Sequence, residues 1–162
     1  MKMLLYLCLL ILTLGGWSCR QETADRDKAA ADPATQAMAA FRAGQYEKAT
    51  ELYRAALSKD PKSAENYNYL GMAYRFQNQK QPSAELRRLE IEAFTKSTEV
   101  RPDFAVALVN LGSSYYYSGN KEKAAEHFRR VLQIMPAHPQ ADKLKEMITE
   151  AEAGQGQTTT PD

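Results

Sequence analysis

The chain has 162 residues, with 21 Lys and Arg against 20 Asp and Glu, so its formal net charge is only +1. Charges of both signs are interspersed and no basic stripe emerges, which argues against nucleic acid as a partner. When the apolar start and the polar ends are set aside, about 120 residues remain, which is the size of one domain.

At the start of the chain, Lys2 precedes an apolar run over residues 3–14. As a helix this run would span about 18 Å, whereas the hydrocarbon core of a bilayer is about 30 Å thick. A positive start, an apolar middle and a small-residue end are typical of a secretory signal. We therefore predict a signal peptide over 1–18 and an exported protein. Cys8 lies within this segment, so the mature chain keeps a single cysteine and can form no internal disulfide.

The apolar run leads into Gly15-Gly16-Trp17-Ser18-Cys19. A small residue before a cysteine at this place resembles a bacterial lipoprotein signal. The resemblance implies a multiply acylated Cys19, since one acyl chain alone anchors weakly. It also implies that the protein lies at the periplasmic face of an envelope membrane, with the outer membrane favoured over the inner one. Residues 19–32, which are mostly polar, are expected to form a flexible tether.

The pattern around Cys19 departs from the usual lipoprotein signal, because Gly16 replaces a branched aliphatic residue and Trp17 a smaller one. Cleavage after Ser18 by an ordinary signal peptidase therefore stays open. In that case the protein would be periplasmic or secreted, without a lipid anchor.

Farther along the chain, three prolines each follow an aromatic residue by eight positions, and both series have intervals of 41 and then 34 residues: Tyr53 and Pro61, Phe94 and Pro102, Phe128 and Pro136. A fixed period near 34 residues is typical of stacked helical hairpins. In the first and third units, the residues at offsets of four, seven and eight from Ala49 and from Ala124 are apolar, which places them on one helix face before Pro61 and Pro136.

The segments between these helices also repeat, since Tyr67-x2-Leu-Gly71-x2-Tyr74 matches the stretch from Leu108 to Tyr115 at a distance of 41 residues. A glycine inside a helix costs about 1 kcal/mol relative to alanine. We expect close approach of the partner helix to compensate, with the small residue Ala124 facing the glycine of the third unit.

Together these residues resemble the tetratricopeptide repeat (TPR) family. Its pattern is an aromatic residue, Leu-Gly and Tyr in a first helix, then Ala, an aromatic residue, Ala and a closing Pro in a second. The resemblance covers about 30–138 and implies an all-α fold, a right-handed α-solenoid of three hairpins. The repeats would lie at about 30–63, 64–104 and 105–138, within a domain spanning 33–153. Gly119 stands where the family turns from one helix to the next.

Two units depart from the pattern. The first has Ala37 and Ala40 where the others have Gly and Tyr. Terminal repeats often depart from the family pattern in this way. The second carries seven extra residues within 78–84, which are interpreted either as a partner-contacting protrusion or as a tolerated insertion. It also has Glu90 at the small-residue position. Because burying a carboxylate is costly, we expect a local shift that lets Glu90 reach solvent.

After Pro136, residues 139–153 form an amphipathic pattern whose apolar stripe is Ala141, Leu144, Met147, Ile148 and Ala151. A helix of this kind seals the exposed end of a repeat array, so we predict a C-terminal capping helix. A partner-binding helix is the alternative. The polar residues 154–162 are predicted to be a disordered tail.

In the TPR family the inner helices line a concave groove, and the resemblance places the binding positions residue by residue. They are Phe41, Arg42, Asn68, Met72, Arg75, Phe76, Val106, Val109, Asn110, Ser113, Tyr116 and Tyr117. Aromatic residues, Met and Arg are enriched at interface hot spots. Alternatively, Phe41 covers the first helix and Phe76 packs against the insertion.

A further mode of the family, a Lys/Asn/Arg clamp on a C-terminal carboxylate, is not expected. Only Asn110 matches it, since the other four positions hold Ala34, Met38, Tyr69 and Val106. The better candidate ligand is an extended or helical segment of another protein with apolar side chains.

No catalytic motif is recognisable, and we expect neither enzyme activity, cofactor nor metal. His127 and His138 lack the spacing of metal ligands and are expected to be exposed to solvent. The function expected is an exported, membrane-tethered protein-interaction module. It resembles small TPR lipoproteins that act as scaffolds or assembly factors for pili or outer-membrane complexes. The alternatives are a self-associating scaffold and a non-catalytic subunit of an enzyme complex, and the partner and the oligomeric state stay open.

Overall fold

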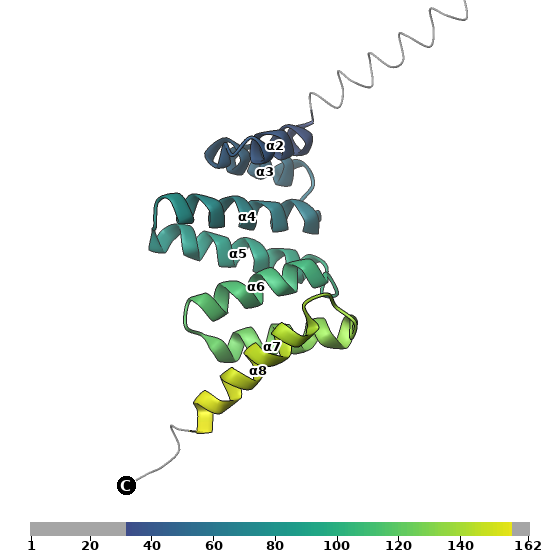
Figure 1. Ribbon diagram of the computed structural model, residues 1–162. Helices are drawn as coiled ribbons and strands as arrows, with labels where there is room; N and C mark the ends of the chain where they lie inside the picture. The colour runs from purple at the N-terminus through teal and green to yellow at the C-terminus, as the bar shows by residue number, and fades with distance from the viewer. Residues whose placement is uncertain (1–31, 157–162) are drawn as a thin grey trace, which may run out of the picture.

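The computed structural model describes residues 32–156, and within them all regular structure is helical. The helices pair into three stacked hairpins followed by one further helix (Figure 1). They are α2 (Pro33–Arg42) with α3 (Tyr46–Lys59), α4 (Ala64–Lys80) with α5 (Ala84–Val100), α6 (Ala105–Tyr117) with α7 (Lys121–Ile134), and α8 (Ala141–Gly156). The predicted fold class, a helical solenoid of three hairpins with a terminal capping helix, is thereby confirmed. The predicted signal peptide, Cys19 and residues 20–31 of the tether lie outside the described residues.

Side-chain caps set the first residue of four helices. In each case an oxygen of the residue before the helix accepts a hydrogen bond from a backbone N–H of the first turn, which would otherwise have no partner. The pairs are Asp32 with Thr35, Ser63 with Asn66, Ser83 with Leu86, and Asn120 with Lys123. Pro33 also occupies the first turn of α2, where its missing N–H is harmless.

Two glycines make the tight turns of the first and third hairpins. Gly44 has φ 71° and Gly119 has φ 87°, which is the left-handed region that favours glycine. The second of these turns is the one expected from the sequence at Gly119.

The seven additional residues of the second unit lengthen both of its helices. α4 has 17 residues against 13 in α6, and α5 has 17 against 14 in α7. The extra turn of α4 is fixed to the first hairpin: the amide of Gln77 donates to Tyr46 O at 3.0 Å and Thr50 Oγ1 at 3.2 Å, and Lys80 Nζ donates to Gly44 O. The insertion is thus an ordered extension of the hairpin.

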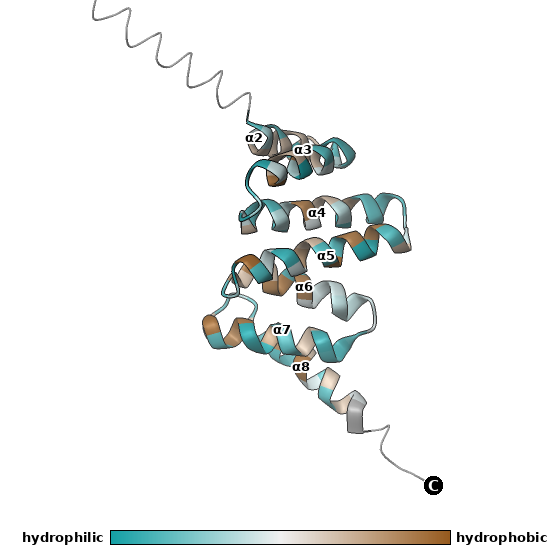
Figure 2. Ribbon diagram, turned by 180° about the vertical axis from the view of Figure 1, so that it is seen from behind, coloured by the Kyte–Doolittle hydropathy of each residue, from teal (hydrophilic) through white to brown (hydrophobic). Residues whose placement is uncertain are grey.

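The buried apolar side chains form two clusters along the solenoid. One joins α2 to α5 and includes Ala37, Tyr53 and Tyr74, and the other joins α6 to α8 and includes Phe128 and Val131. In Figure 2 the C-terminal end of α7 is coloured as hydrophobic. There Ile134 is 38% and Met135 42% exposed.

The glycines of the inner helices are required by aromatic rings. A Cβ added to Gly112 would lie 2.5 Å from Cε1 of Phe128, and one added to Gly71 would lie 2.7 Å from the ring of Phe94. Both distances are too short for a real contact. The partner helix therefore does approach Gly112 closely, as expected, and the three atoms nearest to an added Cβ belong to Phe128, the repeating aromatic residue.

Helix α8 packs its apolar stripe on the third hairpin. Leu144, Met147, Ile148 and Ala151 are buried in the second cluster, whereas Ala141 is half-buried. The helix continues to Gly156, three residues into the segment predicted to be a disordered tail. Across residues 32–156, no helix is long and apolar enough to cross a membrane.

Candidate protein-binding surface

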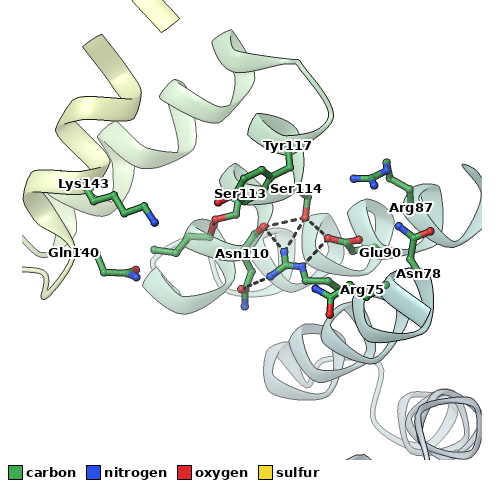
Figure 3. Close-up of a pocket in the computed structure, with 12 residues that line it drawn as sticks. Arg75, Asn78, Arg87, Glu90, Asn110, Ser113, Ser114, Tyr117, Gln140 and Lys143 are labelled. Atoms are coloured by element: carbon green, nitrogen blue, oxygen red, sulfur yellow. Dashed lines mark hydrogen bonds and ion pairs between the residues drawn. The ribbon is translucent and has the colours of Figure 1, made fainter. Parts of the chain in front are cut away.

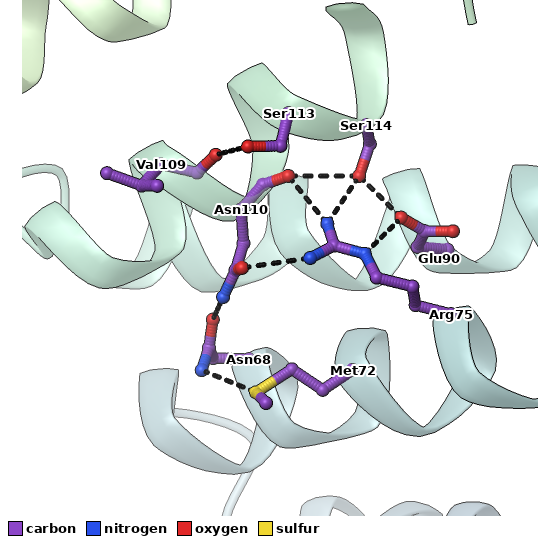
Figure 4. Close-up of polar contacts among 8 residues, drawn as sticks. All are labelled: Asn68, Met72, Arg75, Glu90, Val109, Asn110, Ser113 and Ser114. Carbon is purple, nitrogen blue, oxygen red and sulfur yellow. Dashed lines mark hydrogen bonds and ion pairs between the residues drawn. The ribbon is translucent and has the colours of Figure 1, made fainter. Parts of the chain in front are cut away.

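A polar network joins the second and third hairpins, and Arg75 of α4 is its centre (Figure 4). Its Nε donates to Oε1 of Glu90 at 2.9 Å. Its two terminal nitrogens donate to Oδ1 and the backbone O of Asn110, at 3.0 and 2.8 Å, and to Oγ of Ser114 at 2.9 Å. The guanidinium also lies over the ring of Phe94, 4.8 Å from its centroid. Arg75 therefore uses its donors inside the protein.

Glu90 is the residue for which the sequence prediction was wrong. Its side chain is only 4% exposed and does not reach solvent. Oε1 of Glu90 accepts both from Arg75 and from the hydroxyl of Ser114, at 2.6 Å. A buried charge is tolerated when it is paired and hydrogen-bonded. The partners that satisfy Glu90 come from α4 and α6, so its own helix gave no sign of them.

The network continues through Asn110 to the N-terminal part of α4. The amide nitrogen of Asn110 donates to Oδ1 of Asn68 at 2.9 Å, and the amide of Asn68 in turn contacts the sulfur of Met72. The hydroxyl of Ser113 donates to the backbone O of Val109. Six predicted groove residues thus bond to one another or to their own helix: Asn68, Met72, Arg75, Val109, Asn110 and Ser113.

Two other predicted residues of the first two hairpins, Phe41 and Phe76, lie in an aromatic cluster. The Phe41 ring makes edge contacts with Tyr46, Tyr69 and Phe76, and Tyr46 stacks on Phe76 with 5.0 Å between centroids. All four rings are half-buried. Phe76 therefore packs on the first hairpin through Tyr46 and Phe41. Arg42, by contrast, is exposed.

The adjacent tyrosines at the end of α6 have different surroundings. Tyr117 is 70% exposed, while the hydroxyl of Tyr116 is hydrogen-bonded to the carboxylate of Glu150 on α8. That hydrogen bond raises the pKa of Tyr116, and Lys121 together with Tyr116 lowers the pKa of Glu150. Tyr116 thus fastens the capping helix, whereas Tyr117 and Val106, which is 52% exposed, stay open to solvent.

A cavity of about 510 Å³ lies where α4, α5 and α6 meet the start of α8 (Figure 3). The Arg75–Glu90 network forms part of its wall, and Tyr117 lies at its edge. The longer hairpin contributes Asn78 and Arg87, while Gln140 comes from the residue just before α8 and Lys143 from the first turn of α8. In Figure 3, Arg87 and Lys143 stand on opposite sides of the cavity.

Sequence reasoning missed Asn78, Arg87, Gln140 and Lys143 as candidate site residues. They belong to the extension, to an outer helix and to the capping segment, and the family pattern places the groove on inner helices only. The seven extra residues were the one available signal, because they add the turn of α4 that brings Asn78 to the cavity.

Both histidines are half-buried, so the prediction that they are exposed was wrong. The imidazole of His127 stacks on Tyr115 with 5.6 Å between centroids, and burial lowers its pKa. Nδ1 of His138 accepts a hydrogen bond from the backbone N–H of Gln140. In residues 32–156, no group of three or more His, Cys, Asp or Glu side chains is placed to hold a metal ion.

Comparison with known proteins places this geometry in a family of repeats. The family model for the tetratricopeptide repeat matches residues 105–138, and a second model, for the TPR repeat, matches residues 39–77. These stretches are tetratricopeptide repeats. The chain accordingly contains a TPR protein–protein interaction module.

Curated relatives match only over a part of their length. The chain is 32% identical over 109 residues to the antiviral innate immune response effector IFIT1 of Macaca fascicularis, which covers 59% of this chain and 23% of that protein. It is 31% identical over 102 residues to a probable UDP-N-acetylglucosamine–peptide N-acetylglucosaminyltransferase, SPINDLY, of Solanum lycopersicum, covering 62% of this chain and 10% of that protein. The chain thus spans less than a quarter of either relative.

Solved structures share the fold at low sequence identity. The Yersinia enterocolitica type III secretion chaperone SycD, in complex with a peptide of the translocator YopD, superposes with a TM-score of 0.66 and 11% identity. The match covers 79% of this chain and 95% of that one. The Arabidopsis OM64 TPR domain superposes with a TM-score of 0.64 and 18% identity, covering 76% of this chain and 96% of that one.

Proposed function

We propose that this protein is an exported, membrane-tethered TPR module that holds a segment of another envelope protein, as a scaffold or assembly factor. The observation that carries the proposal is the cavity beside Tyr117. An exposed tyrosine at the edge of a concave site supplies a large contact area at low cost in conformational entropy, and tyrosine is enriched among hot spots.

Relatives of the same fold support a peptide as the ligand. SycD has been solved with a peptide of YopD, and the second TPR domain of human RPAP3 with a peptide of HSP70. The volume of about 510 Å³ is within the range of pockets that bury a few side chains of a ligand. We infer that the cavity takes side chains of an extended segment that runs along the inner helices.

The proposal of a membrane tether is based on the sequence before residue 32. The signal-like run over 3–14 is followed by four residues and then Cys19, and a polar stretch separates Cys19 from the cap of α2 at Asp32. A lipid on Cys19 would keep the module near a membrane surface, where partner segments in the envelope are concentrated.

Site-specific photocrosslinking tests the binding site. A photoreactive phenylalanine analogue replaces Tyr117 in the cells that make the protein, and the matched control carries it at Arg130, an exposed residue of the outer helix α7. We expect a discrete adduct with a second envelope protein from position 117 and none from position 130. Equal adducts at both positions would contradict the site, and an adduct with a second copy of the chain would replace the proposal by a self-associating scaffold.

Metabolic labelling with palmitate tests the tether. We expect the wild-type chain to incorporate the label and to sediment with membranes, and the Cys19→Ala variant to do neither. An intact mass showing an unmodified Cys19 at the mature N-terminus would end the lipoprotein assignment while leaving the interaction site untouched.

A further inference from the structure

We propose that the cavity selects a partner segment bearing acidic side chains, with Arg87 and Lys143 as the two residues that receive its carboxylates. This inference rests on the proposed function, because it assigns the chemistry of the segment bound at the same cavity. It differs from the carboxylate clamp, whose positions in this chain are occupied mainly by Ala34, Met38 and Tyr69.

Three acceptor atoms on the wall of the cavity already have donors within the protein. Oε1 of Glu90 accepts from Arg75 and Ser114, and Oδ1 of Asn110 accepts from Arg75. Oδ1 of Asn78 accepts from the backbone N–H of Ser83 at 2.7 Å. A donor on a ligand would therefore compete with internal hydrogen bonds at these three atoms.

Two cationic side chains of the cavity, in contrast, have free donors. Within residues 32–156, neither Arg87 nor Lys143 forms an ion pair or a side-chain hydrogen bond, although both line the cavity. Glu146 lies one helical turn beyond Lys143 without pairing with it, and Asp142 pairs with Lys145 instead. The amide nitrogen of Asn78 also has no acceptor among the described residues. This surplus of positive charge and donors is complementary to carboxylates.

The charge of Arg75 does not add to this surplus, because Glu90 compensates it within the wall. The two uncompensated cations stand at opposite sides of the cavity, one on the lengthened second hairpin and one on the capping helix (Figure 3). An extended segment that crosses the cavity would pass between them, with Tyr117 beside its backbone. Two acidic side chains on one segment would therefore meet both cations.

A neighbouring contact with α8 shows a cation and a tyrosine binding a carboxylate within this chain. Lys121 of α7 and the hydroxyl of Tyr116 hold the carboxylate of Glu150, with Lys121 Nζ 2.5 Å from Oε1. Arg87 occupies the position in the second hairpin that Lys121 occupies in the third, 34 residues later. Lys121 of the third repeat thus pairs with a carboxylate of α8. Arg87, at the equivalent position of the second repeat, has no carboxylate partner within residues 32–156.

The test uses the full chain in detergent and a ten-residue peptide of Glu, Leu and Ser, labelled with rhodamine. Both ends are blocked, so that only side chains carry the peptide's charge. Two counterparts have Gln or Lys in place of every Glu. Fluorescence anisotropy at low salt is expected to show at least fivefold tighter binding of the Glu peptide than of the Gln peptide. Binding should weaken when the salt concentration rises, since partly exposed ion pairs are screened.

The substitutions Arg87→Gln and Lys143→Gln should each weaken binding of the Glu peptide about two- to fivefold, and together about tenfold, with little effect on the Gln peptide. The control Arg130→Gln removes the same charge from an exposed position outside the cavity and should change nothing. Equal affinity for the Glu and Gln peptides, or an unchanged double variant, would overturn the proposal. If crosslinking at position 117 persists in that case, the proposed function stands and only the acidic chemistry of the segment is wrong.

Discussion

Arg75 on α4 and Glu90 on α5 form a buried ion pair, with 2.9 Å between Nε and Oε1. Both residues also bond to α6, through Ser114, so that the pair joins three helices of two hairpins. The charge that seemed out of place in the repeat pattern is in this way a contact between repeats.

Replacing Glu90 with alanine should leave the guanidinium of Arg75 without its partner. Breaking a buried pair in this way costs about 3–5 kcal/mol, and because the Arg75 side chain is 24% exposed we expect about 2–4 kcal/mol from the free energy of unfolding. Urea denaturation followed by circular dichroism measures the loss. The double variant Arg75→Met/Glu90→Leu should recover at least half of it, since no unpaired charge remains. A loss below about 1 kcal/mol for Glu90→Ala would mean that water already solvates the pair.

Adding a methyl group to a glycine that faces an aromatic ring should lower the stability of the protein. Gly112→Ala would place a Cβ about where the ring of Phe128 now lies, and overpacking of this kind costs about 1–3 kcal/mol. Gly154→Ala, on α8 with nothing near its added Cβ, should be neutral or slightly stabilising. Thermal denaturation of the two variants compares them, and Gly112→Ala combined with Phe128→Leu should regain part of the loss. Equal melting temperatures for both single variants would contradict the close contact.

The stability of the third hairpin should depend on pH through His127. Burial against Tyr115 lowers the pKa of His127, so the folded protein favours the neutral imidazole. Below the usual pKa of about 6.5 the unfolded chain binds a proton that the folded chain resists, and stability falls as the pH falls from 7.5 to 5.5. Above that window the contribution of His127 is fully present.

The variant His127→Gln isolates this effect, because it cannot titrate. We expect its melting temperature to change less between pH 7.5 and 5.5 than that of the wild type. Carboxylates whose pKa is lowered, such as those of Glu65 and Glu150, titrate at lower pH and lose their contribution only there. Parallel pH profiles of variant and wild type would show that His127 is freely solvated in its neutral and charged forms alike.

The capping helix should contribute to stability through Leu144, which is 3% exposed in the second apolar cluster. Leu144→Ala is expected to lower the free energy of unfolding by about 2–4 kcal/mol. Lys145→Ala, whose side chain is 63% exposed on the outer side of the same helix, should stay within about 0.5 kcal/mol of the wild type. If both variants unfold at the same urea concentration, α8 is docked too loosely to seal the array, and Lys143 would lose its fixed place beside the cavity.

The repeat pattern predicted the fold because it is local: the aromatic residue, the glycine and the proline of each unit recur at fixed spacing and fill one another's space. The fate of Glu90 could not be predicted in this way. Its partners Arg75 and Ser114 stand 15 and 24 positions away on other helices, and neither belongs to the repeat pattern. The predicted concave residues were placed by family position alone, and that gives no information on which of them bond to one another. Arg87 lies on the outer helix α5 and Lys143 on α8, so neither was among the inner-helix positions that the family pattern assigns to the groove.

The lengthened second hairpin also limits how this protein can vary. The added turns of α4 and α5 correspond to rises of about 6 and 4.5 Å, so the two helices grow nearly equally and the turn over residues 81–83 still closes. An insertion confined to one helix would offset their ends and break the hydrogen bonds from Gln77 to the first hairpin. Reshaping the cavity by lengthening or shortening this hairpin therefore requires paired changes in both helices. A substitution of Arg87 alone leaves the hairpin intact. The distance between the two cations depends on the helix lengths, whereas their chemical identity depends on single residues, so each can change without the other.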